Sequence, residues 1–133
     1  MKLFRAFLAF GLVATLGACT TVTPPIPLGL EASSSSKQHN EAGIQHYQME
    51  HWDVAKKHFE AAVQADPTQA EPHFNLGLAL HQLGSHPEAT THFKKAVELD
   101  PTNSAMTYSD VYQSHMGVVS QGYQQKSYGG GYY

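Results

Sequence analysis

Residues 76–101 read LGLALHQLGSHPEATTHFKKAVELDP, and this stretch decides the fold. Residues 42–67, which lie 34 positions earlier, read AGIQHYQMEHWDVAKKHFEAAVQADP. Identical residues recur at this spacing, among them the pairs Gly43/Gly77, Ala55/Ala89, Phe59/Phe93, Ala62/Ala96, Val63/Val97, Asp66/Asp100 and Pro67/Pro101. A repeated unit of this length predicts a stack of similar helical hairpins, because each unit buries its apolar face against the next.

The repeated residues predict two antiparallel helices in each unit. The alanines are small enough for neighbouring helices to approach closely, and Phe59 and Phe93 fill the space between them. Gly43 and Gly77 each cost about 1 kcal/mol inside a helix, so close packing of the paired helix is expected at both. Proline after each second helix ends it, since the residue before proline avoids the helical conformation.

The second copy resembles the tetratricopeptide-repeat (TPR) pattern through Leu76, Gly77, Leu80, Gly84, Ala89, Phe93, Ala96 and Pro101. The first copy departs from it at Ala42, where the family prefers leucine, and at His46, where it prefers a large aromatic residue. The resemblance implies an all-α, right-handed solenoid of two TPR hairpins, over residues 37–69 and 70–103. Asn103 or Ser104 can begin a further helix and Gly117 can stop it, which predicts a C-terminal capping helix over residues 104–116 of a domain spanning 37–116.

The first 18 residues have the features of an export signal. Lys2 and Arg5 precede the uncharged apolar run 6–16, which is too short for a membrane span of about 20 residues. Residues 16–19, Leu-Gly-Ala-Cys, resemble a bacterial lipobox, and this implies cleavage before Cys19 and attachment of palmitate-type acyl chains to it. The alternative is an ordinary secretory leader in which the cysteine stands at the cleavage site by chance.

The resemblance to lipoproteins also implies a location in the cell envelope. An aspartate after the lipidated cysteine favours the inner membrane, and Thr20 stands there instead, so we expect an outer-membrane anchor facing the periplasm. Residues 19–36 contain three prolines and a serine run, which predict a flexible tether that lifts the folded body away from the bilayer. Residues 117–133 are rich in Gly, Tyr and Gln and are expected to be disordered.

Charge limits the classes of partner. Without its first 18 residues the chain has six lysines, no arginine and eleven acidic residues, which gives a net charge of −5 with neutral histidines. A chain of this charge without a basic cluster is not expected to bind nucleic acid. Membrane attachment is therefore assigned to the lipid alone.

The nine histidines are the candidates for chemistry. His39 and His46 are seven residues apart, as are His51 and His58, which is too far for chelation from one helix. We expect structural histidines and no metal or cofactor, with adventitious metal or a pH-sensitive contact as the alternatives. No phosphate-binding loop, nucleophile motif or HExxH sequence is present, so the chain is not expected to be an enzyme.

The first helix of each TPR hairpin lines the concave groove of the family. Helical spacing places a stripe of polar, aliphatic and aromatic residues on that face, and aromatic residues are common binding anchors. The predicted partner-binding residues are Asn40, Ile44, Tyr47, Phe74, Leu78, His81, Tyr108 and Tyr112. Some of them could instead pack on one another as core. Asn75 matches one asparagine of the TPR carboxylate clamp, but Ala105 and Ser109 stand at its later basic positions, so chaperone-tail recognition is not expected.

Together these features predict a membrane-anchored TPR adaptor that binds a partner protein or peptide in the cell envelope, as a monomer or weak homo-oligomer. The alternative is a structural lipoprotein that self-associates and has no specific peptide ligand. A stable oligomer would favour the second reading, and a monomer would favour the first.

Overall fold

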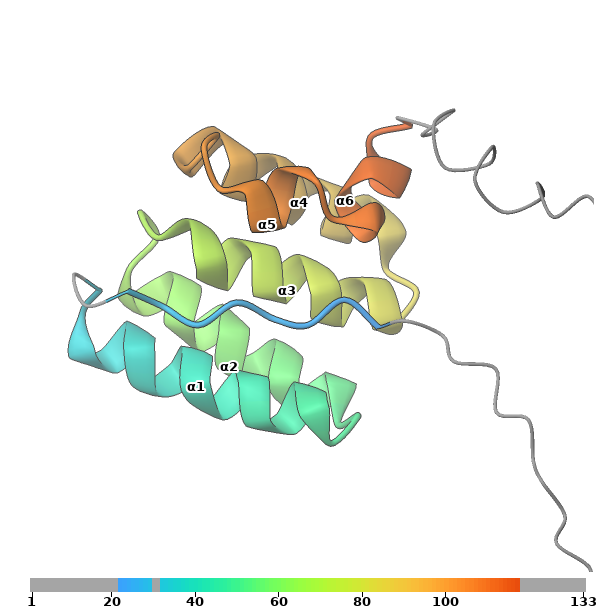
Figure 1. The fold of residues 1–133 in the computed structure, drawn as a ribbon. Coiled ribbons are helices and arrows are strands. Elements are labelled where there is room, and N and C mark those ends of the chain that lie inside the picture. The colour runs from blue at the N-terminus through green and yellow to red at the C-terminus, as the bar shows by residue number, and fades with distance from the viewer. Residues whose placement is uncertain (1–21, 30–31, 118–133) are drawn as a thin grey trace, which may run out of the picture.

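The computed structural model describes residues 22–29 and 32–117, and all the regular secondary structure in this part of the chain is helical. Figure 1 shows long helical hairpins stacked side by side, followed by short C-terminal helices. The elements are α1 (Ser34–Gln48), α2 (Trp52–Ala65), α3 (Ala70–Gln82), α4 (His86–Leu99), α5 (Ser104–Thr107) and α6 (Asp110–His115). The predicted all-α arrangement of two repeats and a C-terminal cap is therefore confirmed.

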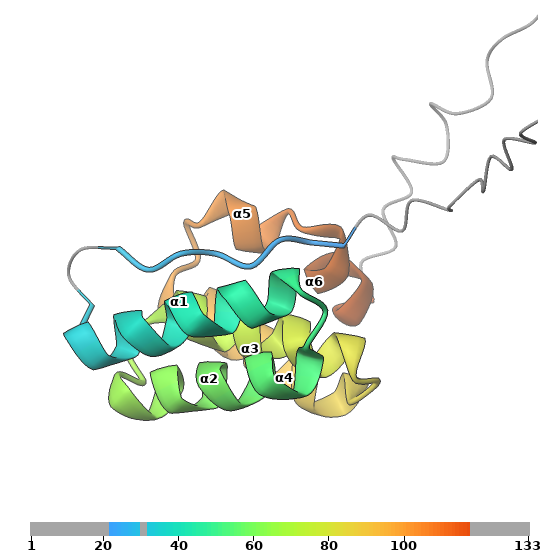
Figure 2. The same cartoon turned by 90° about the horizontal axis from the view of Figure 1, so that it is seen from below.

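The two hairpins form two layers. Figure 2 shows α1 and α3 in one layer and α2 and α4 in the other, with an extended segment crossing the open side of the α1–α3 layer. The first helix of each hairpin thus lines one common face, as the repeat pattern implies.

The close approach of the paired helices depends on glycine. A Cβ atom built on Gly43 would lie 2.5 Å from Phe59, and one built on Gly77 would lie 2.6 Å from Phe93. Both distances are shorter than any ordinary contact, so each phenyl ring packs directly on a bare helix backbone. The packing role predicted for the two glycines is confirmed.

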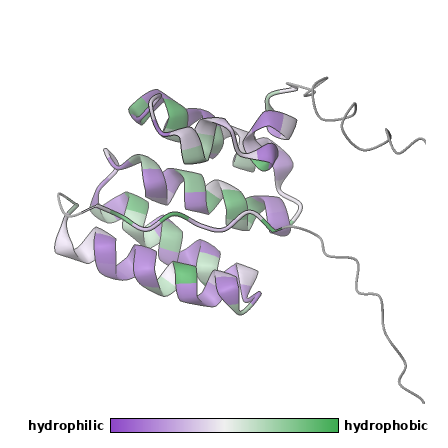
Figure 3. Cartoon of the chain, viewed as in Figure 1, coloured by the Kyte–Doolittle hydropathy of each residue, from purple (hydrophilic) through white to green (hydrophobic). Residues whose placement is uncertain are grey.

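The apolar core is centred on α3. Every residue from Pro72 to Leu80 is buried, whereas α1 buries only Ser36, Asn40, Gly43 and Tyr47. Figure 3 shows the same contrast, since the visible face of α1 is mostly hydrophilic and α3 mixes polar with apolar positions. Helix α3 is buried on all sides because α1, α2, α4, the C-terminal helices and the extended segment surround it.

Two expected boundaries differ from the observed ones. Helix α1 begins at Ser34 instead of residue 37, because the Ser33 hydroxyl accepts a hydrogen bond from the Ser36 amide and caps it. The single helix expected over 104–116 is divided into α5 and α6, since Ser109 begins a new helix by accepting a hydrogen bond from the Tyr112 amide. The serine run assigned to the tether is therefore partly helical.

Cys19, the predicted leader over 1–18 and the tail from residue 118 onward lie outside the described residues. Within the described ranges, no helix has the length and apolar character that crossing a membrane requires.

Candidate functional site

Residues 22–29 form an extended segment that we call the strap. The strap lies in the concave groove over α3, with α1 along one side and α5 and α6 along the other (Figures 1 and 2). It runs antiparallel to α1, so Val22 lies beside Tyr47 and Glu50 near the end of that helix. The tether expected over 19–36 is therefore wrong for this part of the chain, which contacts the folded body.

One backbone unit of the strap carries its polar contacts. The Ile26 amide donates to Asn75 Oδ1 at 2.7 Å, and Asn75 Nδ2 donates back to the Ile26 carbonyl at 2.7 Å. Asn40 Nδ2 donates to the same carbonyl at 3.2 Å, and its Oδ1 accepts from Asn75 at 2.9 Å. Both asparagines are fully buried. Buried amides need partners, so the two asparagines are satisfied by the strap and by each other.

The strap sequence explains why Ile26 is the residue bound. Pro24, Pro25 and Pro27 have no backbone N–H, so Ile26 is the sole donor among residues 24–27. The prolines also keep the backbone extended, which lowers the entropy lost when it is held in a groove. Leu28 is buried while its neighbours Pro27 and Gly29 are exposed, as expected where alternate residues of an extended chain face a surface.

The groove has an open end next to Val22. A pocket of about 500 Å³ lies there, lined by Tyr47, Leu78, His81 and Gln82 together with the strap and α6. Burial raises the pKa of the Tyr47 phenol, although a hydrogen bond from Gln82 opposes the shift. Burial lowers the pKa of His81, which favours its neutral form. The pocket therefore offers neutral aromatic and amide groups beside the acidic side chain of Asp110.

The predicted groove residues other than Phe74 fall into four groups. Tyr47 and Leu78 are buried in the core and line the pocket from below, together with His81. Ile44 and Tyr112 are half-buried at the edge of the core. Tyr108 is 75% exposed and borders a second, shallower hollow beside Pro24. Asn40 is buried under the strap, whose backbone it holds.

Phe74 requires a correction. Its side chain is fully buried, and its ring centroid lies 5.3 Å from that of Phe93. It therefore belongs to the core, so Phe74→Ala is expected to destabilise the fold. The spacing argument placed it on the concave stripe but could not show that its ring packs against Phe93 of α4.

Sequence reasoning also missed the functional importance of Asn75 and Ile26. Asn75 was compared with a carboxylate clamp, whereas it binds a peptide unit. The available signal was Ile26, the one residue with a backbone N–H among three prolines, together with Asn75 in the middle of the helix that forms the core.

The comparisons agree with this architecture. The tetratricopeptide repeat family model matches residues 40–104. The match runs from the middle of α1 to the first residue of α5. Domains of this family are typically non-catalytic modules for protein–protein interaction or scaffolding. A comparison with curated proteins finds no match.

Proposed function

We propose that this protein is a lipid-anchored TPR adaptor of the cell envelope, which binds an extended segment of a partner protein in the groove now filled by the strap. The observation that carries the proposal is the pair of 2.7 Å hydrogen bonds between Asn75 and the Ile26 peptide unit. A groove that binds its own extended chain through backbone atoms has the chemistry to bind another extended chain in the same way.

The strap sequence describes the partner that would fit. Backbone hydrogen bonds do not select side chains, so selection falls to the apolar positions that flank the bound peptide unit. In the strap these positions are Ile26 and Leu28, held on a proline-rich backbone. The expected ligand is an extended, proline-containing segment with an aliphatic residue whose N–H is free to donate to Asn75.

Strap binding would also control the distance from the membrane. If Cys19 carries the lipid, only residues 20 and 21 separate it from Val22, a reach of about 10 Å at ~3.3 Å per residue. Release of the strap would free the whole segment before Ser34 and extend the reach to roughly 50 Å. Partner binding in the groove would thereby move the TPR domain away from the bilayer.

A labelled peptide with the strap sequence, residues 20–30, tests the groove without a known partner. In the full chain, Ile26→Pro removes the backbone N–H that donates a hydrogen bond to Asn75, while the backbone stays extended. We expect this variant to bind the peptide at least tenfold more tightly than the natural chain. Adding Asn75→Ala should abolish the gain, because the groove then lacks the side chain that holds the peptide unit.

The matched control is the same peptide with Ile26→Pro, which should not bind any variant. Fluorescence anisotropy measures the affinities, and circular dichroism checks the fold. Equal peptide binding by the natural chain and the Ile26→Pro variant would contradict the proposal. Unfolding of the Ile26→Pro variant would contradict it too, because the strap would then be part of the core and unable to yield to a partner.

Anchoring has its own test. Cys19→Ser should abolish the mass increase from acyl chains and move the protein from the membrane to the soluble fraction, because no apolar segment of membrane-spanning length is expected elsewhere. Membrane fractionation and intact-mass measurement decide it. If the mutant stayed in the membrane fraction, Cys19 would not be the anchor, and the proposed lipid attachment and outer-membrane location would both be contradicted.

The strap contacts also favour a second candidate, a self-associating lipoprotein. The strap of one copy could fill the groove of another and join the copies without any foreign partner. Size-exclusion chromatography with light scattering separates the two functions. A stable oligomer that Ile26→Pro dissociates would favour assembly, and a monomer would favour the adaptor.

A further inference from the structure

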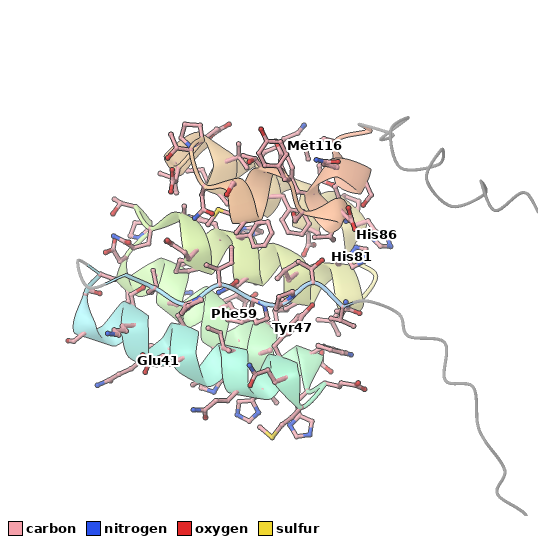
Figure 4. The ribbon with its side chains drawn as sticks, in the orientation of Figure 1. Glu41, Tyr47, Phe59, His81, His86 and Met116 are labelled. Carbon is pink, nitrogen blue, oxygen red and sulfur yellow. The ribbon has the colours of Figure 1, made fainter. Side chains whose placement is uncertain are left out.

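Three histidines from three helices meet beside the open end of the groove. His81 lies in the last turn of α3, His86 begins α4, and His115 ends α6. A ring nitrogen of each lies within 4.8 Å of a ring nitrogen of the other two. Figure 4 shows His81 and His86 together where the chain turns from α3 to α4. The spacing argument considered one helix at a time and therefore could not find this group.

Hydrogen bonds orient His115 as a metal ligand. The Thr90 hydroxyl lies 2.8 Å from the His86 carbonyl, which can only accept, so the hydroxyl donates its proton there. Thr90 Oγ1 must then accept from His115 Nδ1–H at 2.7 Å. This fixes the tautomer of His115 and leaves Nε2 with a free lone pair, since one ring nitrogen of neutral histidine carries the proton. A threonine that binds the far nitrogen is the kind of outer contact that aligns metal-bound histidines.

The free lone pair of His115 faces another histidine. His115 Nε2 lies 2.9 Å from His81 Nδ1, so one proton joins the two rings. The ring of Phe93 packs against His115 with a centroid distance of 5.1 Å and holds it from the core side. A metal ion would bind both nitrogens in place of that proton, and neutral His81 would then carry its proton on Nε2. Tetrahedral zinc with Zn–N bonds of ~2.0–2.1 Å separates its nitrogen ligands by about 3.4 Å, so small side-chain rotations suffice.

The first repeat shows that the fold does not need histidines here. The residues 34 positions before His81 and His86 are Tyr47 and Trp52. Their rings form an edge-on pair with a centroid distance of 4.7 Å, and the two histidine rings pair edge-on at 5.1 Å. Large aromatic rings satisfy the packing at this corner in one repeat. The second repeat has nitrogen donors in the same places, and α6 adds a third.

We propose that His81, His86 and His115 form a binding site for a divalent transition-metal ion of the class that prefers imidazole, namely Zn²⁺, Cu²⁺ or Ni²⁺. His86 is exposed, so water can reach the site from its side. The bound ion joins α6 to the corner between α3 and α4, and it therefore fastens the C-terminal cap to the second repeat.

The test is titration of the full chain with Zn²⁺ alone, purified in detergent without a histidine tag and followed by calorimetry. We expect one tight site per chain. His86→Gln should weaken that site at least tenfold, and Thr90→Val should weaken it about 10–100-fold by releasing His115. The matched control is His51→Gln, an exposed histidine of the first repeat whose ring lies near His46, and it should leave the tight site unchanged.

Thermal melts supply the second readout. A ligand that binds only the folded state raises the melting temperature, so Zn²⁺ should raise it for the natural chain and for His51→Gln but not for His86→Gln. Because His86 is exposed, its replacement should leave the fold intact where His115→Gln could loosen the cap. Equal Zn²⁺ affinity in the natural chain and His86→Gln would overturn the site, as would loss of the tight site in His51→Gln alone.

Discussion

The two repeats share one sequence template but occupy different environments. Helix α3 buries every residue from Pro72 to Leu80, whereas α1 buries four residues and leaves much of its surface in water. The second repeat packs against neighbours on both sides, and the first forms one end of the stack. The same helical pattern therefore forms a core helix in the second repeat and an end helix in the first. Substitutions at matched positions should then change the free energy of unfolding by different amounts.

The largest expected difference concerns Phe93 and Phe59. Both rings are fully buried, and each packs on a glycine of its own repeat. Phe93 also contacts Phe74 and His115, which belong to different elements. Phe93→Ala should lower the free energy of unfolding by ~3–5 kcal/mol, and Phe59→Ala should lie at or below the lower end of that range.

Urea denaturation followed by circular dichroism measures both variants. Val54→Ala serves as the control, because Val54 is exposed and its truncation should cost less than about 0.5 kcal/mol. A larger loss for Phe59→Ala than for Phe93→Ala would show that the first repeat carries the stability of the fold.

Glycine substitution should affect the repeats equally, which sharpens the comparison. The Cβ added by Gly43→Ala or Gly77→Ala meets a phenyl ring at 2.5 or 2.6 Å. Overpacking of this kind costs ~1–3 kcal/mol, partly offset by the better helix propensity of alanine. Gly29→Ala, where nothing lies within 4 Å of the added atom, is the control. Unequal losses from denaturant curves would mean that one phenyl ring can move aside more easily than the other.

The sequence was sufficient to predict the features that depend on local repetition. The helical hairpins, the glycine contacts and the asparagine that begins α5 follow from residue type and spacing. The strap could not be predicted, because a proline-rich segment has no periodicity and its binding depends on Asn75, 49 residues away. The division of the cap at Ser109 had a signal, since Ser-Asp is a common helix start, but the apolar spacing across it favoured one helix.

The histidine pair His73 and His92 should make the second repeat sensitive to acid. Their Nδ1 atoms lie 3.3 Å apart, and His73 also contacts the Pro67 carbonyl. Burial is the main cause that lowers the pKa of both. At His73 the hydrogen bond with the Pro67 carbonyl opposes this shift and the charge of Lys95 adds to it; at His92 the charge of His73 adds to the shift, while Glu88 and Glu60 oppose it. The unfolded chain therefore binds protons first, and stability falls as pH drops below about 6.5.

Thermal melts between pH 7.5 and pH 5 measure this dependence. The double variant His73→Gln, His92→Gln should lose less melting temperature over that range than the natural chain. The equivalent pair in the first repeat is His39 and His58, whose ring centroids lie 5.9 Å apart. Replacing that pair should flatten the profile less, because His39 is not buried. If replacing His39 and His58 reduced the pH dependence of the melting temperature more, the acid sensitivity would lie in the first repeat, contrary to this prediction.

The smallest expected effect lies at the turn inside each hairpin, where the two repeats have the same backbone and different residues. Glu50 has a φ of 61° and its counterpart Gly84 a φ of 78°. The hydrogen bonds also match, since His51 N–H donates to the His46 carbonyl and Ser85 N–H to the Leu80 carbonyl, both at 2.9 Å. This is the helix ending that usually has glycine in the left-handed position.

A side chain in that conformation costs ~1–2 kcal/mol relative to glycine, while glycine makes the unfolded chain more flexible at a cost of ~0.4–1 kcal/mol. Glu50→Gly should therefore raise the free energy of unfolding by up to about 1 kcal/mol, and Gly84→Glu should lower it by a similar amount. Nothing lies within 4 Å of a Cβ on Gly84, so a loss there reports backbone strain and not a clash. Denaturant curves of the two single variants and their double should give opposite signs that nearly cancel. If both substitutions changed the free energy of unfolding in the same direction, the backbone strain at Glu50 and Gly84 would differ even though the two turns share the same hydrogen bonds.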